Sequence, residues 1–129
     1  MYKIDEMLDL SKTIAKDLFC GKTYAWEILP ELKDEYDAVS ENVWIAKDAK
    51  VFPSAYIAAP CIIDHGAEVR HCAFIRGSAI VGKGAVVGNS TELKNSLLFD
   101  GVQTPHYNYV GDCVLGYKSH MGAGSITSN

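Results

Sequence analysis

Residues 45–93 read, in blocks of six, IAKDAK, VFPSAY, IAAPCI, IDHGAE, VRHCAF, IRGSAI, VGKGAV and VGNSTE, followed by Leu93. An aliphatic residue opens every block, at Ile45, Val51, Ile57, Ile63, Val69, Ile75, Val81, Val87 and Leu93. A self-similar period of this kind is typical of solenoids built from short parallel strands. The stretch therefore predicts a mainly β protein, a parallel β-solenoid, over residues 43–129.

A second inward position follows four residues after the first in each block. Its residues are Ala49, Ala55, Cys61, Ala67, Ala73, Ala79, Ala85, Thr91 and Leu97, and all but the last are small. One large and one small side chain per block would fill the narrow interior of a triangular solenoid at native packing density. Strands of a β-sandwich alternate with a period of two and would not keep a separate phase for the small position.

The period also predicts how residues stack, because three blocks make one turn of the solenoid, called a coil below. Residues 18 apart should lie above one another, at the strand spacing of about 4.8 Å. Two blocks, 93–97 and 110–114, have only five residues, because the next blocks start at Leu98 and Leu115, so the offset should become 17 across them. We expect positive φ angles at corner glycines that follow the aliphatic position, namely Gly82, Gly88, Gly111, Gly116 and Gly122.

Composition excludes several classes of partner. The 129 residues carry 12 basic and 16 acidic side chains, a formal net charge of −4. No basic stretch is long enough to follow a phosphate backbone, and no apolar run could span a bilayer, so neither nucleic acid nor membrane is an expected partner. The N-terminal MYKIDEMLDL has acidic residues where a signal peptide has an apolar core, which favours a cytoplasmic protein. The four cysteines form no CxxC pair, and we expect them to be reduced packing residues.

Residues 1–42 precede the repeat and are predicted to be a helical cap or packing arm for the first coil. One amphipathic helix that stops at Gly21 is expected, because one helical face collects Ile4, Met7, Leu8, Ala15 and Leu18. Residues 24–36 predict one or two further helical turns. At the other end the sequence stops two residues into a block, at Asn129. Since solenoids normally end in a polar cap, this predicts a fragment truncated in mid-coil.

Two cations should stack on one side of the solenoid. Arg76 and Lys94 each follow an aliphatic position and are 18 residues apart. The next positions of the same column are Gly111 and Ser128, so no carboxylate belongs to it. An unpaired pair of stacked cations favours an anion between them, most naturally a phosphate. The alternative is a pair of solvated surface cations.

A second column should contain His71, Asn89, His106 and Ala123. His106 lies in the segment TPHYNY, where a proline and two tyrosines depart from the plain repeat, and such departures often accompany function. A histidine there could act as a general base near neutral pH, or could be an ordinary surface residue. Tyr109 should direct its hydroxyl towards the column of Arg76 and Lys94.

Residues 88–127 carry a resemblance to a known family. The motifs GN, ELKNS, H-x-x-Y-x-G-D (residues 106–112) and GAG-x-IT-x-N follow one another with the spacing of that family, both five-residue blocks included. The family is the acetyltransferase domain of the bifunctional UDP-N-acetylglucosamine pyrophosphorylase and glucosamine-1-phosphate N-acetyltransferase. The resemblance covers roughly residues 43–129 and implies a left-handed parallel β-helix that forms homotrimers, with each site built between subunits.

The resemblance also implies roles for single residues. His106 matches the catalytic base, which deprotonates the sugar amine so that it attacks acetyl-CoA. The sugar phosphate or UDP-sugar would contact Arg76, Lys94 and Tyr109. The acetyl-CoA site would include Ala123 and Asn129. His120 stands where the family has a substrate-binding asparagine, and Arg76-Gly77-Ser78 replaces an Arg-Pro-Gly turn, so the accepted sugar could differ. The nucleotide loop of the pyrophosphorylase half has no match in the chain.

Two other functions stay open at the level of sequence. One is a non-catalytic module that binds a sugar nucleotide or holds a trimer together, as part of a protein related to sugar nucleotidyltransferases. The other is a metalloenzyme similar to the γ-class carbonic anhydrases, which share this fold and bind zinc through three histidines. His65, His71, His106 and His120 are the candidate ligands, but the close H-x-x-x-x-H pair of that class is missing. We therefore predict no metal site.

Overall fold

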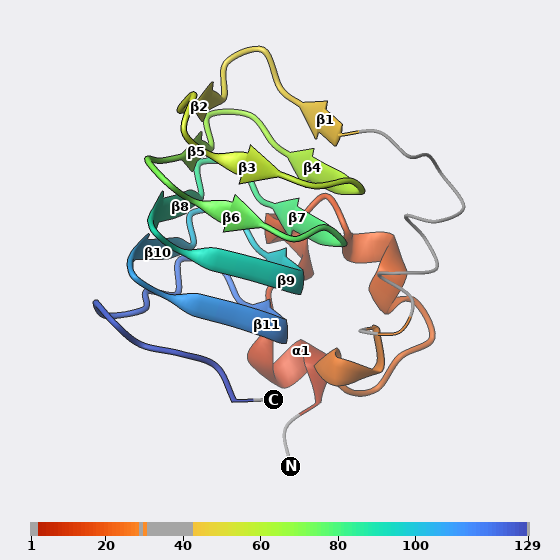
Figure 1. Ribbon diagram of the computed structural model, residues 1–129. Helices are drawn as coiled ribbons and strands as arrows, with labels where there is room; N and C mark the ends of the chain where they lie inside the picture. The colour runs from red at the N-terminus through yellow and green to blue at the C-terminus, as the bar shows by residue number, and fades with distance from the viewer. Residues whose placement is uncertain (1–2, 29, 31–42, 129) are drawn as a thin grey trace.

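The computed structural model describes residues 3–28, 30 and 43–128, and over residues 43–128 it is a left-handed parallel β-helix of about four coils (Figure 1). Its strands are β1 Val43–Ile45, β2 Lys50–Val51, β3 Tyr56–Ile57, β4 Cys61–Ile63, β5 Glu68–Val69, β6 Phe74–Ile75, β7 Ala79–Val81, β8 Val86–Asn89, β9 Glu92–Leu98, β10 Gln103–His106 and β11 Tyr109–Leu115. One set of strands pairs in the order β1-β4-β7-β9-β6-β3, with β11 also on β9, and the other in the order β10-β8-β5-β2. The predicted fold is confirmed.

The register of the strands confirms the predicted stacking. In the upper coils, Val43 pairs with Cys61 and Glu68 with Val86, an offset of 18. From the first five-residue block onward the offset is 17, since Leu98 pairs with Val81 and Val110 with Leu93. Counting along the sequence therefore predicts which residues are neighbours on adjacent coils.

The interior contains the two predicted side-chain positions. The aliphatic position is fully buried from Ile63 to Leu93, and the alanines of the small position are buried with it from Ala67 to Ala85. Leu97 is the exception, because the short block shifts the phase by one residue. Ser96 pairs with Ala79 and takes the small inward position, where its hydroxyl donates to the carbonyl oxygen of Val110 (2.9 Å). Leu97 pairs with Ile80 and faces outward instead.

The expected role of the corner glycines was wrong. None of the five has a positive φ angle; among the described residues such angles occur one or more positions away, at Gly66, Gly84 and Gly101, for example. Gly88 is needed for a different reason. A Cβ there would overlap the backbone of Pro105, which lies directly on it in the next coil. The absence of a side chain lets two coil backbones approach closely.

The short helical segment predicted before the repeat is confirmed, but the prediction of one amphipathic helix up to Gly21 was wrong. The segment has one turn of α-helix, α1 Ile4–Met7, followed by the 3₁₀ turns η1 Leu10–Lys12, η2 Lys16–Phe19 and η3 Ala25–Ile28. Leu8 and Thr13 have extended backbone angles, which end the helical turns before them. The Asp9 carboxylate accepts from the backbone N–H of Ser11 (3.0 Å), an N-cap bond that starts a new turn. Most of residues 24–36 and the predicted boundary at residue 42 lie outside the described residues.

This N-terminal segment, residues 3–28, packs against the lower coils (Figure 1). The prediction was a cap or packing arm for the first coil. The Phe19 and Phe99 rings meet edge to face, with centroids 5.9 Å apart. The backbone N–H of Asp100 donates to the carbonyl oxygen of Lys12 (2.8 Å), and Ile28 is fully buried. The segment joins the hydrophobic core that also contains Ile80 and Leu97, so it covers one outer side of the solenoid.

Among the described residues, no helix has the length and apolar character needed to cross a membrane.

Candidate functional site

The structure stacks Arg76 on Lys94 as the sequence predicts. Ile75 of β6 pairs with Leu93 of β9 on the adjacent coil, and the backbone N–H of Arg76 donates to the carbonyl oxygen of Leu93 (2.8 Å). Gly111 follows in the same column, paired with Lys94. Both cationic side chains are partly exposed on the outer side that β3, β6, β9 and β11 form.

The two cations are not unpaired, which corrects the prediction. Arg76 Nη1 donates to Glu92 Oε1 (2.9 Å), and Lys94 Nζ donates to Asp112 Oδ2 (3.0 Å). The four side chains together carry no net formal charge. Both partners lie in neighbouring columns, which the stacking of residues 17 or 18 apart does not reveal.

Two different features of the backbone bring these carboxylates within reach. Glu92 precedes Lys94 by two residues on β9, so both side chains leave the strand on the same side. Asp112 has a positive φ of 48°, at the corner where β11 bends. Its other oxygen, Oδ1, accepts from Asn95 Nδ2 (2.8 Å). Asn95 is buried, and its own Oδ1 is a buried oxygen without a hydrogen-bond donor in the described structure.

Tyr109 extends towards the cation column as predicted. It pairs with Glu92 at the start of β11, and its ring and hydroxyl lie across Gly111. A Cβ at Gly111 would overlap the Tyr109 hydroxyl. Because Gly111 is the residue below Lys94, the missing side chain gives the tyrosine room beside the Lys94–Asp112 ion pair.

The second predicted column is also present. His106 pairs with Asn89, the backbone N–H of Ser90 donates to the carbonyl oxygen of His71 (3.2 Å), and that of Gly124 donates to the carbonyl oxygen of His106 (3.0 Å). His106 and Ala123 are therefore neighbours on adjacent coils, and both are exposed. Asn129 lies outside the described residues.

The predicted site residues fall on one side and one corner of the solenoid. Arg76, Lys94 and Tyr109 share the side of β6, β9 and β11, and His106 lies at the corner just before that side begins. His120 is further back: it pairs with Gln103, three residues before His106, on the side of β10. The structure thus groups the predicted base with the predicted phosphate-binding residues and leaves His120 apart from them on a single chain.

Sequence reasoning missed Glu92, Asp112 and Asn108. Glu92 had a usable signal, since residues two apart on a strand share a side. Asp112 had none, because its reach depends on the left-handed φ angle at a bend. Asn108 is buried and accepts the backbone N–H of His106 through Oδ1 (3.1 Å), although polar residues at a solenoid corner are usually expected to face water.

The corner that carries His106 has further polar contacts above it. His71 Nδ1 lies 2.7 Å from Ser54 Oγ, and His71 Nε2 lies 3.3 Å from Cys72 Sγ. The described residues contain no group of three or more His, Cys, Asp or Glu side chains that could hold a metal ion. Within a single chain, therefore, the four histidines do not assemble the zinc site of the metalloenzyme alternative.

Among the described residues all four cysteines are free, and two of them lie in the interior. Burial raises the pKa of the Cys61 thiol to about 12 and that of Cys113 to about 11. Both take the small inward position, because Cys61 pairs with Ala79 and Cys113 with Ser96. A thiol that resists ionisation suits the packing role predicted for them.

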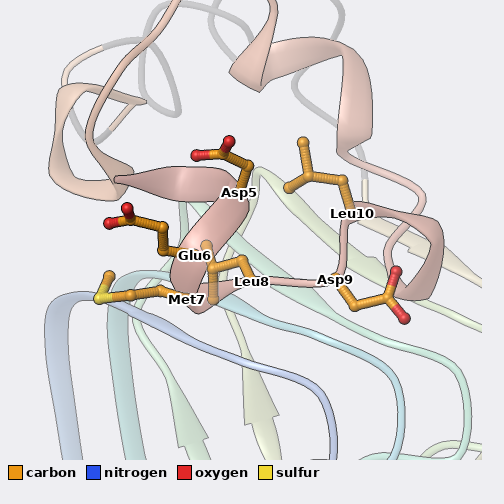
Figure 2. A pocket seen from close by; sticks show the side chains of 6 residues that line it. All are labelled: Asp5, Glu6, Met7, Leu8, Asp9 and Leu10. Atoms are coloured by element: carbon orange, nitrogen blue, oxygen red, sulfur yellow. The ribbon is translucent and has the colours of Figure 1, made fainter. Parts of the chain in front are cut away.

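A surface hollow lies on the N-terminal segment, away from these residues. Figure 2 shows its lining around α1: Asp5, Glu6, Met7, Leu8, Asp9 and Leu10. None of the predicted site residues contributes to it. The lining combines three carboxylates with apolar side chains, and no basic residue is part of it.

Comparison with known proteins places residues 57–129 in a described family, since they match the model of the GMPPB C-terminal domain. The Bifunctional protein GlmU of Thermodesulfovibrio yellowstonii is 34% identical over 91 residues, which are 70% of this chain and 16% of that protein. The Bifunctional protein GlmU of Chromobacterium violaceum is 30% identical over 121 residues, 90% of this chain and 25% of that protein. The chain thus spans a quarter or less of the length of these two relatives.

A solved structure shares the fold. The acetyltransferase domain of PglB from Neisseria gonorrhoeae superimposes with a TM-score of 0.59 at 21% sequence identity, over 80% of this chain and 58% of that one. At this level of identity the likeness concerns the architecture alone.

Proposed function

The chain belongs to the family of the GMPPB C-terminal domain and is also similar to proteins named Bifunctional protein GlmU, and from these premises we propose that it serves as a sugar-phosphate N-acetyltransferase of the glucosamine-1-phosphate type, with acetyl-CoA as co-substrate. The observation that carries the proposal is one of arrangement. His106 stands at the corner that adjoins Tyr109, Lys94 and Arg76, with Ala123 on the next coil. Relatives that bear the name GlmU support the choice of reaction.

In this proposal His106 is the general base. Its exposed imidazole accepts a proton from the sugar ammonium, and the freed amine attacks the thioester carbonyl carbon of acetyl-CoA. A carbon–nitrogen bond forms, the carbon–sulfur bond breaks, and coenzyme A leaves as a thiolate that is then protonated. The products are the N-acetyl sugar phosphate and free coenzyme A.

The phosphate would bind at Arg76 and Lys94, where hydrogen-bond donors remain. A guanidinium has five N–H donors and an ammonium three, so the bonds to Glu92 and Asp112 leave others available. A dianionic phosphate would have to bind beside these carboxylates, which makes its affinity sensitive to them. Tyr109 and His120 would contact the sugar, and Ala123 and Asn129 the acetyl-CoA.

The proposal includes a homotrimer in the cytoplasm. Sites built between subunits would bring His120 and the residues near Asn129 of one chain to the Arg76 side of another. Light scattering during gel filtration measures the mass, and a trimer of the 14.1 kDa chain is the expected result. A monomer at assay concentrations would contradict this part of the proposal.

The test measures coenzyme A release from acetyl-CoA with glucosamine-1-phosphate as acceptor. Loss of a general base costs about 10²–10⁴-fold in rate, and that is the expected effect of His106→Ala. His65→Ala is the matched control, because His65 is an exposed histidine that binds Asp48 at another corner (3.0 Å). No turnover by the wild-type chain with any amino-sugar phosphate would refute the proposal.

A non-catalytic module that binds a sugar nucleotide is the second candidate, and one observation favours it. Arg76 and Lys94 are each neutralised by a carboxylate, which weakens binding of a small substrate held chiefly by its phosphate, whereas a sugar nucleotide also offers its nucleoside for contacts. Calorimetry separates the two functions. Binding of UDP-N-acetylglucosamine that acetyl-CoA leaves unchanged, without turnover, would favour the binding module.

A further inference from the structure

Asn108 is the most completely bonded side chain near the proposed base. It is 3% exposed, although Tyr107 before it is 62% exposed and has a positive φ of 50°. This turn directs the Asn108 side chain into the solenoid, where its amide has no access to water. Its amide must therefore bond to protein groups.

The amide of Asn108 holds two coils at once. Its Oδ1 accepts from the backbone N–H of His106 (3.1 Å). Its Nδ2 donates to the carbonyl oxygens of Gly122 (2.8 Å) and Ser125 (3.1 Å) on the next coil. Gly122 and Ser125 flank Ala123, so one side chain connects the backbone of the proposed base to the turn that carries a proposed acetyl-CoA contact.

The backbone of Asn108 holds a third coil. Its N–H donates to Thr91 Oγ1 (3.3 Å), and its carbonyl oxygen accepts from the N–H of Glu92 (2.9 Å). Thr91 Oγ1 in turn donates to the carbonyl oxygen of Thr104, two residues before His106 (3.1 Å). The turn at residues 106–108 is thus bonded to the preceding coil through Thr91 and Glu92, within itself through Asn108 Oδ1, and to the next coil through Asn108 Nδ2.

We propose that Asn108 is a positioning residue, which sets the base His106 and the acetyl-CoA contact Ala123 in mutual register by bonding both of their coils through one buried amide. This inference rests on the proposed function. Asparagine suits the task because its side chain is an acceptor and a double donor at once. Aspartate has the same shape but no donor, so at this site it would put a carboxylate oxygen against two carbonyl oxygens.

The variant Asn108→Asp tests the inference. It keeps an acceptor for His106 and removes the donors to Gly122 and Ser125. Misplacement by about 1 Å can cost on the order of 10²-fold in rate, so we expect kcat to fall by about 10–100-fold. We also expect KM for acetyl-CoA to rise, because the Ala123 turn loses its bonds. KM for the sugar phosphate should stay within about twofold, since Arg76 and Lys94 are on another side.

Thr104→Val is the matched control. It also removes one buried hydrogen bond on β10, from Thr104 Oγ1 to the carbonyl oxygen of Val86 (2.9 Å), but none that involves Asn108 or Ala123. It should lower the unfolding temperature and leave kcat and both KM values near those of the wild type. If Asn108→Asp behaves like Thr104→Val once rates are normalised to the folded fraction, Asn108 is only structural and the inference fails.

A measurement without turnover separates this inference from the proposed function. Hydrogen exchange of the His106 backbone amide reports its bond to Asn108 Oδ1 directly. Asn108→Ala should accelerate exchange at His106, and should shift the imidazole NMR signals of His106 but not those of His65. This variant also serves if Asn108→Asp does not fold. An inactive wild-type chain would sink the proposed function alone, whereas unchanged exchange and imidazole signals in Asn108→Ala would sink the positioning role.

Discussion

Two outer sides of the same solenoid differ in exposure: the N-terminal segment covers one of them, and the other is open. The outward residues of β4, β7, β9 and β11 form a covered column, Ile62, Ile80, Leu97 and Val114, whose central members Ile80 and Leu97 are 4% and 0% exposed. The outward residues of β3, β6 and the starts of β9 and β11 form an open column, Tyr56, Phe74, Glu92 and Tyr109. There, Tyr56 and Phe74 are 64% and 42% exposed.

The inward residues of these strands are alike, so they do not explain the difference. Aliphatic and small residues build each coil on both sides, whereas the outward residues decide which side the N-terminal segment covers and which side stays accessible. The covered column is entirely apolar, and the open column mixes aromatic rings with an acidic residue and adjoins Arg76 and Lys94. The fold and the site therefore depend on alternate positions of the same strands.

Breaking the covered side should cost the most stability. Phe99→Ala removes a fully buried ring and its contact with Phe19, and we expect the free energy of unfolding to fall by about 3–5 kcal/mol. Urea denaturation followed by circular dichroism measures it. Phe74→Ala, on the open side, is the control and should cost much less. Similar losses in the two variants would show that the two sides do not differ as described.

The shared interior should make the protein sensitive to alkali. The Cys61 thiol has an ordinary pKa of 9.0, and burial raises its pKa to about 12 in the folded chain. Below pH 9 both states keep the proton. Above it the unfolded chain ionises and the folded chain does not, so stability falls by up to about 1.4 kcal/mol per pH unit towards the folded pKa. Between pH 8 and 10.5 the free energy of unfolding should fall more steeply with pH for the wild type than for Cys61→Ala. Equal slopes would contradict the burial of this thiol.

The aromatic pair of the open side should contribute less. Tyr56 and Phe74 meet edge to face with centroids 5.7 Å apart, and such a pair is worth about 0.5–1.5 kcal/mol. A double-mutant cycle with Tyr56→Ala and Phe74→Ala in urea measures the coupling. A coupling energy of zero would mean that the rings are independent in solution.

The ion pairs of the open side should matter least for stability. Arg76 and Glu92 are both partly exposed, so Arg76→Ala should change the free energy of unfolding by about 0–1 kcal/mol, and less at high salt. The same variant should weaken binding of glucosamine-1-phosphate if the proposed function holds. A loss of stability as large as that of Phe99→Ala would place Arg76 in the structural framework instead.

Features that the six-residue repeat determines were predicted correctly, whereas features that depend on caps, bends or contacts between columns were not. Strand register was predictable because inward packing repeats with the blocks, so even the change from 18 to 17 followed from counting. Prediction of the N-terminal helix failed because helical spacing of Ile4, Leu8 and Leu18 says nothing of the caps and extended residues between them. The ion pairs at Glu92 and Asp112 were missed because they cross between columns, and one of them depends on a backbone angle that the repeat does not encode.

The packing of residues 3–28 on the lower coils sets an order of events during synthesis. The ribosome makes this segment before the coils on which it packs, and Phe99 emerges 80 residues after Phe19. At about 5–20 residues per second, that is a delay of about 4–16 s. Each coil can pack on the preceding coil as it is made. Phe19 and Ile28, in contrast, become buried only after the lower coils have been made. Residues 3–28 are therefore made before the coils that bury them, and during that interval a chaperone would find them exposed.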